Sequence, residues 1–149
     1  MFKRTTFKFL FLAALTAFWI SGGPVGLNTG VAKLHAAPLP DQGVIVYQFH
    51  RRFRCDACYK LENAINEALQ THFPEELKAG SLIFKVIDLD AEGSGDFEKQ
   101  YDFFYNTVIM VDRENGKETR FKNLEEVWGL VEDKEAAAEF IRSEIAEYL

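Results

Sequence analysis

The sequence predicts an α/β domain in which helices flank a central mixed β-sheet. Apolar runs of strand length alternate with helical patterns after residue 41. The first two strand-like runs are separated by one helical segment, and such a crossover requires parallel pairing. Two later runs flank Asn115-Gly116, a dipeptide typical of tight hairpins, which adds an antiparallel pair. A mixed sheet with helices on both faces follows from this order.

The first forty residues have the composition of an export segment. Basic residues at positions 3, 4 and 8 precede the apolar run Phe9–Ile20, and small residues follow it. No charge occurs between Lys8 and Lys33, so an uncleaved membrane anchor is the alternative. We assign residues 1–37 to a signal peptide or membrane anchor plus linker. The expected location is the periplasm, or the outer face of the cytoplasmic membrane, of a bacterium.

Residues 38–149 form one predicted domain, because a chain of 149 residues with 48% apolar side chains suits a single core. All four basic residues before Asp41 belong to the N-terminal segment. The exported part therefore keeps 13 of the 17 Lys and Arg against 23 Asp and Glu, a net charge of −10. Such a charge repels nucleic acid and anionic lipid. We expect no nucleic-acid partner, and membrane contact only through the N-terminal segment.

The first half of the domain contains a strand, a helix and a second strand. Val44–Phe49 is an apolar, β-branched run, which is typical of a central strand. A helical pattern begins at Cys55 and ends before Pro74. Its apolar face consists of Cys58, Leu61, Ile65, Ala68 and Leu69. A polar turn at 78–80 then leads to the strand-like run Leu82–Asp90, which completes the crossover.

The second half opens with a short helix and the hairpin. Aromatic residues recur at i, i+4 and i+7 over Phe97–Phe104, with Ser94 or Asp96 available as N-cap. The hairpin strands are expected at Thr107–Asp112 and Lys117–Phe121.

Two capping patterns mark the C-terminal part. Asn123 and Glu126 have the spacing of a capping box, which predicts a helix start before Val127. Asp133 can cap the last helix. The apolar stripe of that helix consists of Ala137, Phe140, Ile141, Ile145, Tyr148 and Leu149. This amphipathic stripe indicates that the last helix packs on the sheet.

The predicted order is strand, helix, strand, helix, hairpin, helix, and Cys55-x-x-Cys58 opens the first helix. This order is the pattern of the thioredoxin-like fold. A ferredoxin-like metal-binding module also carries Cys-x-x-Cys after its first strand, but the final helix and the extra length disfavour it. The chain has only two cysteines, so a disulfide framework and a four-thiolate zinc site are excluded.

The Cys-x-x-Cys motif predicts thiol–disulfide exchange. Cys55 lies at a helix start, where unpaired backbone N–H groups lower the pKa of a thiol below its reference of about 8.5. The guanidiniums of Arg51, Arg52 and Arg54 are expected to stabilise the thiolate further. Cys55 is therefore the predicted nucleophile, and Cys58 the residue that resolves the mixed disulfide. The expected redox group is the Cys55-Cys58 disulfide itself, with no further cofactor. The structural alternative is that both cysteines are only packed in the core as small hydrophobic residues.

A soft-metal site is the main functional alternative. Cys55, Cys58 and His50, the only nearby proton acceptor, offer ligands to Cu(I), Zn(II) or As(III). On this interpretation the protein binds or delivers the metal. Four other polar residues are assigned to the surface or to strand positions without chemistry: His72, Lys85, Asp88 and Asp90. Four aromatic residues are assigned to the core in preference to a partner surface: Phe103, Phe104, Tyr105 and Trp128.

Three motifs carry a resemblance to a known family: Tyr47-x-Phe49-His50, Arg54-Cys55-x-x-Cys58, and Asn123-Leu124 with Trp128. Together they resemble the small thioredoxin-like proteins of the nitrophenyl compound nitroreductase subunit ArsF family, over about Val44 to Leu149. The resemblance implies a thioredoxin fold and thiol redox work beside a membrane transporter or electron-transfer protein. The expected partner is accordingly a protein thiol or disulfide.

The sequence departs from ordinary thioredoxins in three places. Their Trp-Cys-Gly-Pro-Cys motif is replaced by Arg54-Cys-Asp-Ala-Cys58, which has no proline. Their buried carboxylate has only Gln48 or Phe49 as its counterpart, and neither titrates. Their cis-proline is replaced by Thr107-Val108, the residues expected opposite the cysteines. Without proline a cis bond costs about 3 kcal/mol, so we predict a trans peptide there.

Overall fold

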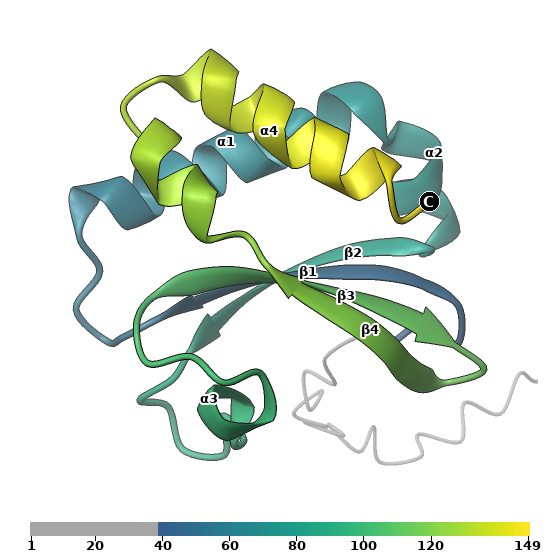
Figure 1. Cartoon of the computed structure of the whole chain (residues 1–149), viewed down its shortest axis with the longest axis horizontal. Helices are drawn as coiled ribbons and strands as arrows, with labels where there is room; N and C mark the ends of the chain where they lie inside the picture. Colours follow the sequence, from purple (N-terminus) through teal and green to yellow (C-terminus); the bar gives the residue numbers. More distant parts are fainter. Residues whose placement is uncertain (1–38) are drawn as a thin grey trace, which may run out of the picture. The chain divides into compact units, whose positions relative to one another are not determined.

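The computed structural model describes residues 39–149 (Figure 1). The signal or anchor assignment for residues 1–37 lies outside this described part, and so it stays a prediction. Within residues 39–149, the helices are all too short or too polar to span a membrane.

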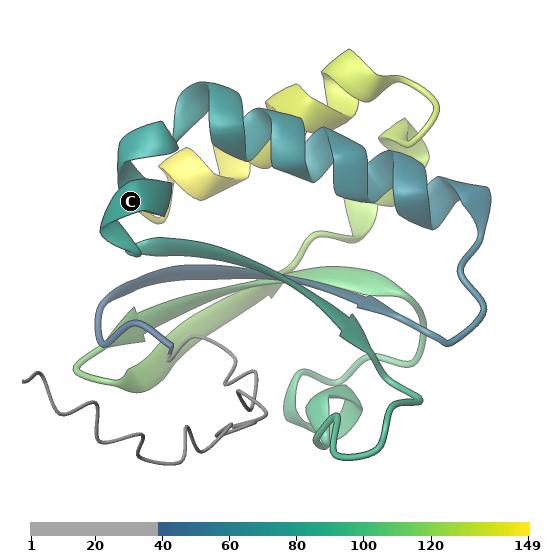
Figure 2. The same cartoon turned by 180° about the vertical axis from the view of Figure 1, so that it is seen from behind.

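The described chain forms a four-stranded sheet with helices on both faces (Figures 1 and 2). In chain order the elements are β1 Gly43–His50, α1 Asp56–His72, α2 Pro74–Ala79, β2 Leu82–Asp88, α3 Phe97–Gln100, β3 Thr107–Glu114, β4 Lys117–Asn123, the 3-10 helix η1 Glu125–Leu130 and α4 Lys134–Ala146. The strand order is β2-β1-β3-β4, with β1 parallel to β2 and β3 antiparallel to both neighbours. The predicted thioredoxin-like fold with a mixed sheet is confirmed.

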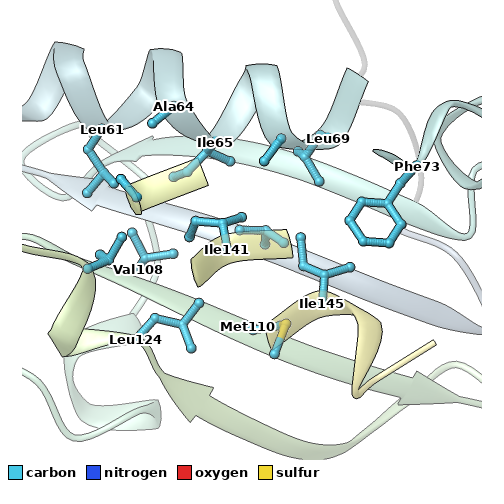
Figure 3. Close-up of a cluster of buried hydrophobic side chains, with 14 of the residues drawn as sticks. Leu61, Ala64, Ile65, Leu69, Phe73, Val108, Met110, Leu124, Ile141 and Ile145 are labelled. Carbon is cyan, nitrogen blue, oxygen red and sulfur yellow. The ribbon is translucent and has the colours of Figure 1, made fainter. Parts of the chain in front are cut away.

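Strand β1 lies at the centre because its side chains are buried on both faces. Val44 and Val46 point toward α1 and α4, where they join a mainly aliphatic cluster that we call the helical layer (Figure 3). Its other large members include Leu61, Ile65, Leu69, Val108, Met110, Leu124, Ile141 and Ile145. Each buried Leu or Ile contributes about 1.5–3 kcal/mol to stability, so this layer fixes α1 on the sheet.

The alternate residues of β1 point to the opposite face, where the short helix α3 lies (Figure 1). We call this cluster the aromatic layer. It consists of Ile45, Tyr47, Phe49, Tyr101, Phe103, Ile109 and Val111, with Phe97 packed against it. The rings of Phe49 and Phe103 stack with centroids 4.9 Å apart. This packing holds the chain that leads from α3 into β3.

Of the three predictions made from turn and capping residues, two are confirmed and one is wrong. Asn115 and Gly116 adopt φ values of 51° and 75°, as a tight hairpin requires, and the hairpin is confirmed. The carboxylate of Asp133 accepts a hydrogen bond from the Ala136 N–H at 3.0 Å and caps α4 as predicted. The prediction that Asn123 caps a helix is wrong. Asn123 is the last residue of β4, and the segment after it is a 3-10 helix whose N-cap is Leu124.

Two other local predictions need correction. The predicted polar turn at 78–80 is mostly helical, because Pro74 begins the six-residue helix α2, which ends at Ala79 with Gly80 as its C-cap. Proline suits a first helical position, where its missing N–H would have no partner. Among the aromatic residues assigned to the core, Phe103 is buried, but Phe104 is 74% and Tyr105 83% exposed. These two side chains lie on the surface of the loop before β3.

Candidate redox site

The two cysteines lie at the first turn of α1, directly after the loop that leaves β1. Cys55 is the N-cap residue, in an extended conformation, and its side chain is exposed. Cys58 is fully buried on the inner side of α1. The two sulfurs are 3.2 Å apart and both thiols are free. Since a disulfide bond is about 2 Å long, a shift of about 1 Å would join them.

The two thiols differ in acidity. The pKa of Cys55 is lowered, first by the hydrogen bond with the Cys58 thiol and then by backbone N–H groups at the start of α1. The pKa of Cys58 is raised, first by burial and then by its contact with Cys55. The exposed sulfur therefore carries more thiolate than the buried one at a given pH.

The three arginines before Cys55 bind acidic and aromatic side chains. Arg51 pairs with Asp90 at 3.1 Å and also with Glu98. The Arg52 N–H donates to the same Asp90 carboxylate at 2.9 Å. These contacts anchor the loop before the cysteines, and they give Asp90 a structural role that its position at a strand end did not indicate.

The third arginine is engaged in the same way. Arg54 pairs with Glu62 and lies 4.2 Å over the ring of Tyr59. The Arg52 guanidinium donates to the backbone oxygen of Asp90 at 3.2 Å, so each of the three arginine side chains is engaged with groups other than the cysteines. A direct role for them in stabilising the thiolate therefore remains a prediction without a supporting contact.

Gln48 lies behind the cysteines on β1. Its side chain is fully buried, and Nε2 donates to the backbone oxygen of Cys58 at 2.8 Å. Its Oε1 is buried without a hydrogen-bond partner. An amide that holds the first turn of α1 thus stands where ordinary thioredoxins are expected to carry a carboxylate.

His50 ends β1 and is also buried. Its Nδ1 lies 2.8 Å from the backbone oxygen of Arg51. Because a carbonyl oxygen can only accept, Nδ1 is the donor in this contact, and in a neutral ring Nε2 is then the acceptor nitrogen. His72, by contrast, is exposed at the last turn of α1, as expected.

Sequence reasoning missed Asn106, the residue directly before β3. Its Nδ2 donates to the sulfur of Cys58 at 3.3 Å, and its Oδ1 accepts from the Arg51 N–H at 3.1 Å. The neighbouring Thr107 instead donates through Oγ1 to Asn123 Oδ1 at 2.5 Å, and Val108 is buried in the helical layer. The only available signal was the position of Asn106 next to the predicted Thr107-Val108 segment.

The peptide between Thr107 and Val108 is trans, as predicted, and no cis bond occurs within residues 39–149. A groove of about 480 Å³ begins beside Asn106. It is lined by Asp102, Phe103, Phe104, Tyr105, Asn106, Thr107, Asn123, Glu125 and Trp128. On the cysteine loop itself, Phe53 is 90% exposed. Exposed aromatic side chains therefore lie on two segments that meet at the thiols.

A larger hollow of about 660 Å³ runs along α1 and residues 131–134, but neither cysteine lines it. Its lining residues are polar except for Val131, and they include the ion pairs of Lys60 with Glu132 and of Lys134 with Glu67. In the part of the chain that the structure describes, no three His, Cys, Asp or Glu side chains gather as a metal site. Cys55 and Cys58 alone would offer two thiolates to a soft ion.

No protein-family model matches the chain, and no curated protein matches it significantly. Solved structures with a similar fold include Fasciola hepatica thioredoxin, with 14% identity, a TM-score of 0.43, and coverage of 73% of this chain and 84% of that one. The reduced Schistosoma mansoni thioredoxin pre-protein has 13% identity, a TM-score of 0.44, and coverage of 73% and 82%. The zinc-bound form of human ERp44 has 21% identity, a TM-score of 0.43, and coverage of 70% and 28%.

These similarities concern the fold alone. The resemblance to the ArsF family has no support from sequence comparison, and it stays a prediction. The strand order, the parallel β1–β2 crossover and the Cys-x-x-Cys at the start of α1 establish independently that the domain has a thioredoxin-like fold.

Proposed function

We propose that the protein is an exported thiol–disulfide oxidoreductase that exchanges electrons with a polypeptide partner through Cys55 and Cys58. One observation carries the proposal: an exposed thiol of lowered pKa lies 3.2 Å from a buried thiol at the start of α1. Two cysteines that only packed as small hydrophobes would both be buried, whereas Cys55 is exposed.

The proposed reaction begins when the Cys55 thiolate attacks one sulfur of a partner disulfide. The partner S–S bond breaks, a mixed disulfide forms, and the departing partner thiolate takes a proton. Cys58 then loses its proton and attacks the Cys55 sulfur, which releases the second partner thiol. The partner gains two electrons and two protons, and the protein becomes the Cys55–Cys58 disulfide. The reverse sequence oxidises a partner dithiol.

His50 is the proposed acceptor for the proton that Cys58 loses. Its Nδ1 is held by the Arg51 carbonyl oxygen, so Nε2 has a free lone pair. Imidazole is also the side chain best suited to proton transfer near neutral pH. The arginines at 51, 52 and 54 contribute by holding the loop that presents Cys55.

The groove beside Asn106 is the proposed docking site for the partner chain. Its exposed aromatic side chains, Phe104 and Tyr105, offer apolar area to an extended polypeptide. We further propose an envelope location and membrane contact through residues 1–37, on the composition of that segment, and a membrane electron-transfer protein as the partner, as the ArsF resemblance implies.

Soft-metal binding or delivery is the second candidate, and the observation that favours it is the short distance between two free thiols. Two thiolates leave a Cu(I), Zn(II) or As(III) ion without a third protein ligand among residues 39–149, since no such group gathers there. Cu(I) can bind to two thiolates alone, whereas Zn(II) or As(III) would need a further ligand, from the partner.

A trapping experiment separates the two candidates. The full-length chain and its Cys58→Ser and Cys55→Ser variants are treated with a peptide that contains one disulfide. The Cys58→Ser variant should accumulate one mixed disulfide per chain, because Cys55 attacks and nothing resolves the product, whereas Cys55→Ser should accumulate little. The wild-type protein should show a reversible two-electron potential in glutathione buffers. A purified protein that holds one soft metal ion per chain and traps no peptide would establish the metal function instead.

A further inference from the structure

The amide of Asn106 contacts a reacting atom from outside the Cys-x-x-Cys motif. It donates to the Cys58 sulfur at 3.3 Å, while its oxygen accepts from the Arg51 N–H at 3.1 Å. The second contact fixes the first, because a flipped amide would turn its oxygen toward the sulfur and its NH₂ toward another donor. The orientation of the amide is therefore set by the backbone of the cysteine loop.

That loop is itself anchored. The Asp90 carboxylate accepts from the Arg52 N–H at 2.9 Å and from the Arg51 guanidinium at 3.1 Å. The Leu89 N–H donates to the His50 carbonyl oxygen at 2.8 Å. On the other side, Asn106 follows a segment that Phe103 pins into the aromatic layer. Both ends of the contact between Asn106 and the Cys58 sulfur are thus positioned before any partner binds.

We propose that Asn106 is a catalytic residue that stabilises negative charge on the Cys58 sulfur, both when this thiolate attacks and when it leaves. An amide N–H donates strongly to a thiolate, but only weakly to a thiol or to a disulfide sulfur. The Cys58 sulfur is buried and Asn106 is half-buried, so this charge-assisted bond is partly shielded from water and is stronger than it would be in full solvent. This inference rests on the proposed redox function, which it deepens.

The pKa of Cys58 agrees with this geometry. Burial raises it, and the hydrogen bond from Asn106 is one of the contacts that lower it. Asn106 therefore offsets part of the cost that burial imposes on the resolving thiolate.

The same contact should act in both directions of the reaction. When the mixed disulfide is resolved, the Cys58 thiolate is the nucleophile; when a partner thiolate attacks the protein disulfide at Cys55, the Cys58 thiolate is the leaving group. When Cys55 is ionised in the reduced protein, the Cys58 thiol can donate its proton to the Cys55 sulfur 3.2 Å away, and part of the negative charge then reaches the Cys58 sulfur. Asn106 should thus favour the dithiol over the disulfide and make the pair a stronger oxidant.

Two substitutions in the full-length chain test this role. Asn106→Asp keeps an acceptor for the Arg51 N–H but removes the donor to sulfur, and Asn106→Leu removes both. Asn66→Asp is the matched control, because the Asn66 amide bonds only the Glu62 carbonyl oxygen on the outer part of α1. The readouts are the reduction potential in glutathione buffers and the rate at which a preformed mixed disulfide with a peptide is resolved.

Both Asn106 variants should resolve the mixed disulfide roughly tenfold or more slowly, as loss of a hydrogen bond to a charged group implies. Their potential should fall by about 30 mV, the equivalent of a tenfold change in the equilibrium. The Asn66→Asp control should stay within about twofold of wild type on both measures.

Three results would overturn the proposal. Wild-type rates and potentials in both Asn106 variants would exclude the role of the amide while leaving the redox function intact. If Asn106→Leu resolved the mixed disulfide slowly while Asn106→Asp resolved it at the wild-type rate, only the hydrogen bond to the Arg51 N–H would be required for resolution. A wild-type protein that does not cycle at all would refute the proposed function, and this inference with it.

Discussion

The face of the sheet beneath α1 and α4 is packed with aliphatic side chains, whereas the opposite face is packed with aromatic rings around the four-residue helix α3. In the helical layer, two long helices supply most of the cover, and Leu61 and Ile141 represent their contributions (Figure 3). In the aromatic layer the rings cover one another, with little regular structure outside the sheet.

This difference explains how the candidate site is assembled. Cys58 lies on the buried side of α1 and is held by Gln48 from β1. Asn106 comes from the other side of the sheet, three residues after Phe103 of the aromatic layer. The helical layer thus positions the Cys58 sulfur, and the aromatic layer positions its donor Asn106. Substitutions in the two layers should therefore affect different members of the site.

The largest effect is expected at Phe49, the centre of the aromatic layer. Its ring is fully buried and lies within 5.0 Å of the ring centroids of Phe97 and Phe103. Phe49→Ala should lower the free energy of unfolding by about 3–5 kcal/mol, because it removes a large buried side chain and leaves a cavity. Urea unfolding followed by circular dichroism measures the change.

Phe121→Ala is the matched control for that experiment. Phe121 is 47% exposed; it pairs with Val111 across the hairpin, and its ring meets that of Tyr101 with centroids 5.1 Å apart. Its loss should cost about 1 kcal/mol or less. Equal costs for the two variants would mean that the aromatic layer does not stabilise the sheet as a buried core does.

A smaller effect is expected in the reactivity of the two thiols, of which Cys55 is exposed to solvent and Cys58 is buried on the inner side of α1. Iodoacetamide should modify Cys55 at least about tenfold faster than Cys58 at pH 7, because thiolate is the reactive form and the pKa of Cys55 is lowered while that of Cys58 is raised. The rate for Cys55 should reach half its plateau below the usual pH of about 8.5. Mass spectrometry of the peptides resolves the two sites.

Urea-unfolded protein provides the reference, since there both cysteines should react alike and near the ordinary pKa of a thiol. If the folded protein also modified both sites at one rate, the difference in burial between Cys55 and Cys58 would have no chemical consequence. The order of attack in the proposed reaction would then lose its basis.

The features that the sequence could predict were those set by local pattern. The β-branched run at 44–49 demanded a buried strand, and the hairpin at Asn115-Gly116 followed from backbone sterics. The Cys-x-x-Cys fell at the start of a helix because the period of apolar residues changes there. These observations together were sufficient for the parallel crossover, the antiparallel hairpin and the thioredoxin-like fold.

The features that the sequence could not predict depend on contacts between distant segments. The partner of Arg51 is Asp90, and the donor to Cys58 is Asn106, 48 positions away in the chain. No local spacing indicates either pair. Asn123 illustrates the same limit. Its spacing to Glu126 fits a capping box, but its side-chain oxygen accepts a hydrogen bond from Thr107 of the neighbouring strand, so that Asn123 ends β4 and does not cap a helix.

The smallest expected effect concerns the cap of α4, at the edge of the helical layer. Asp133 accepts from the Ala136 N–H at 3.0 Å at the start of α4. Asp133→Ala should cost about 1 kcal/mol of unfolding free energy, whereas Asp133→Asn, which keeps a capping oxygen, should cost only a few tenths. Neither change should alter the thiol potential, since α4 packs on α1 through apolar contacts such as Ile141. A shift in potential on Asp133→Ala would instead mean that the capped end of α4 is coupled to the cysteines, and that the helical layer is not the rigid support for Cys58 inferred here.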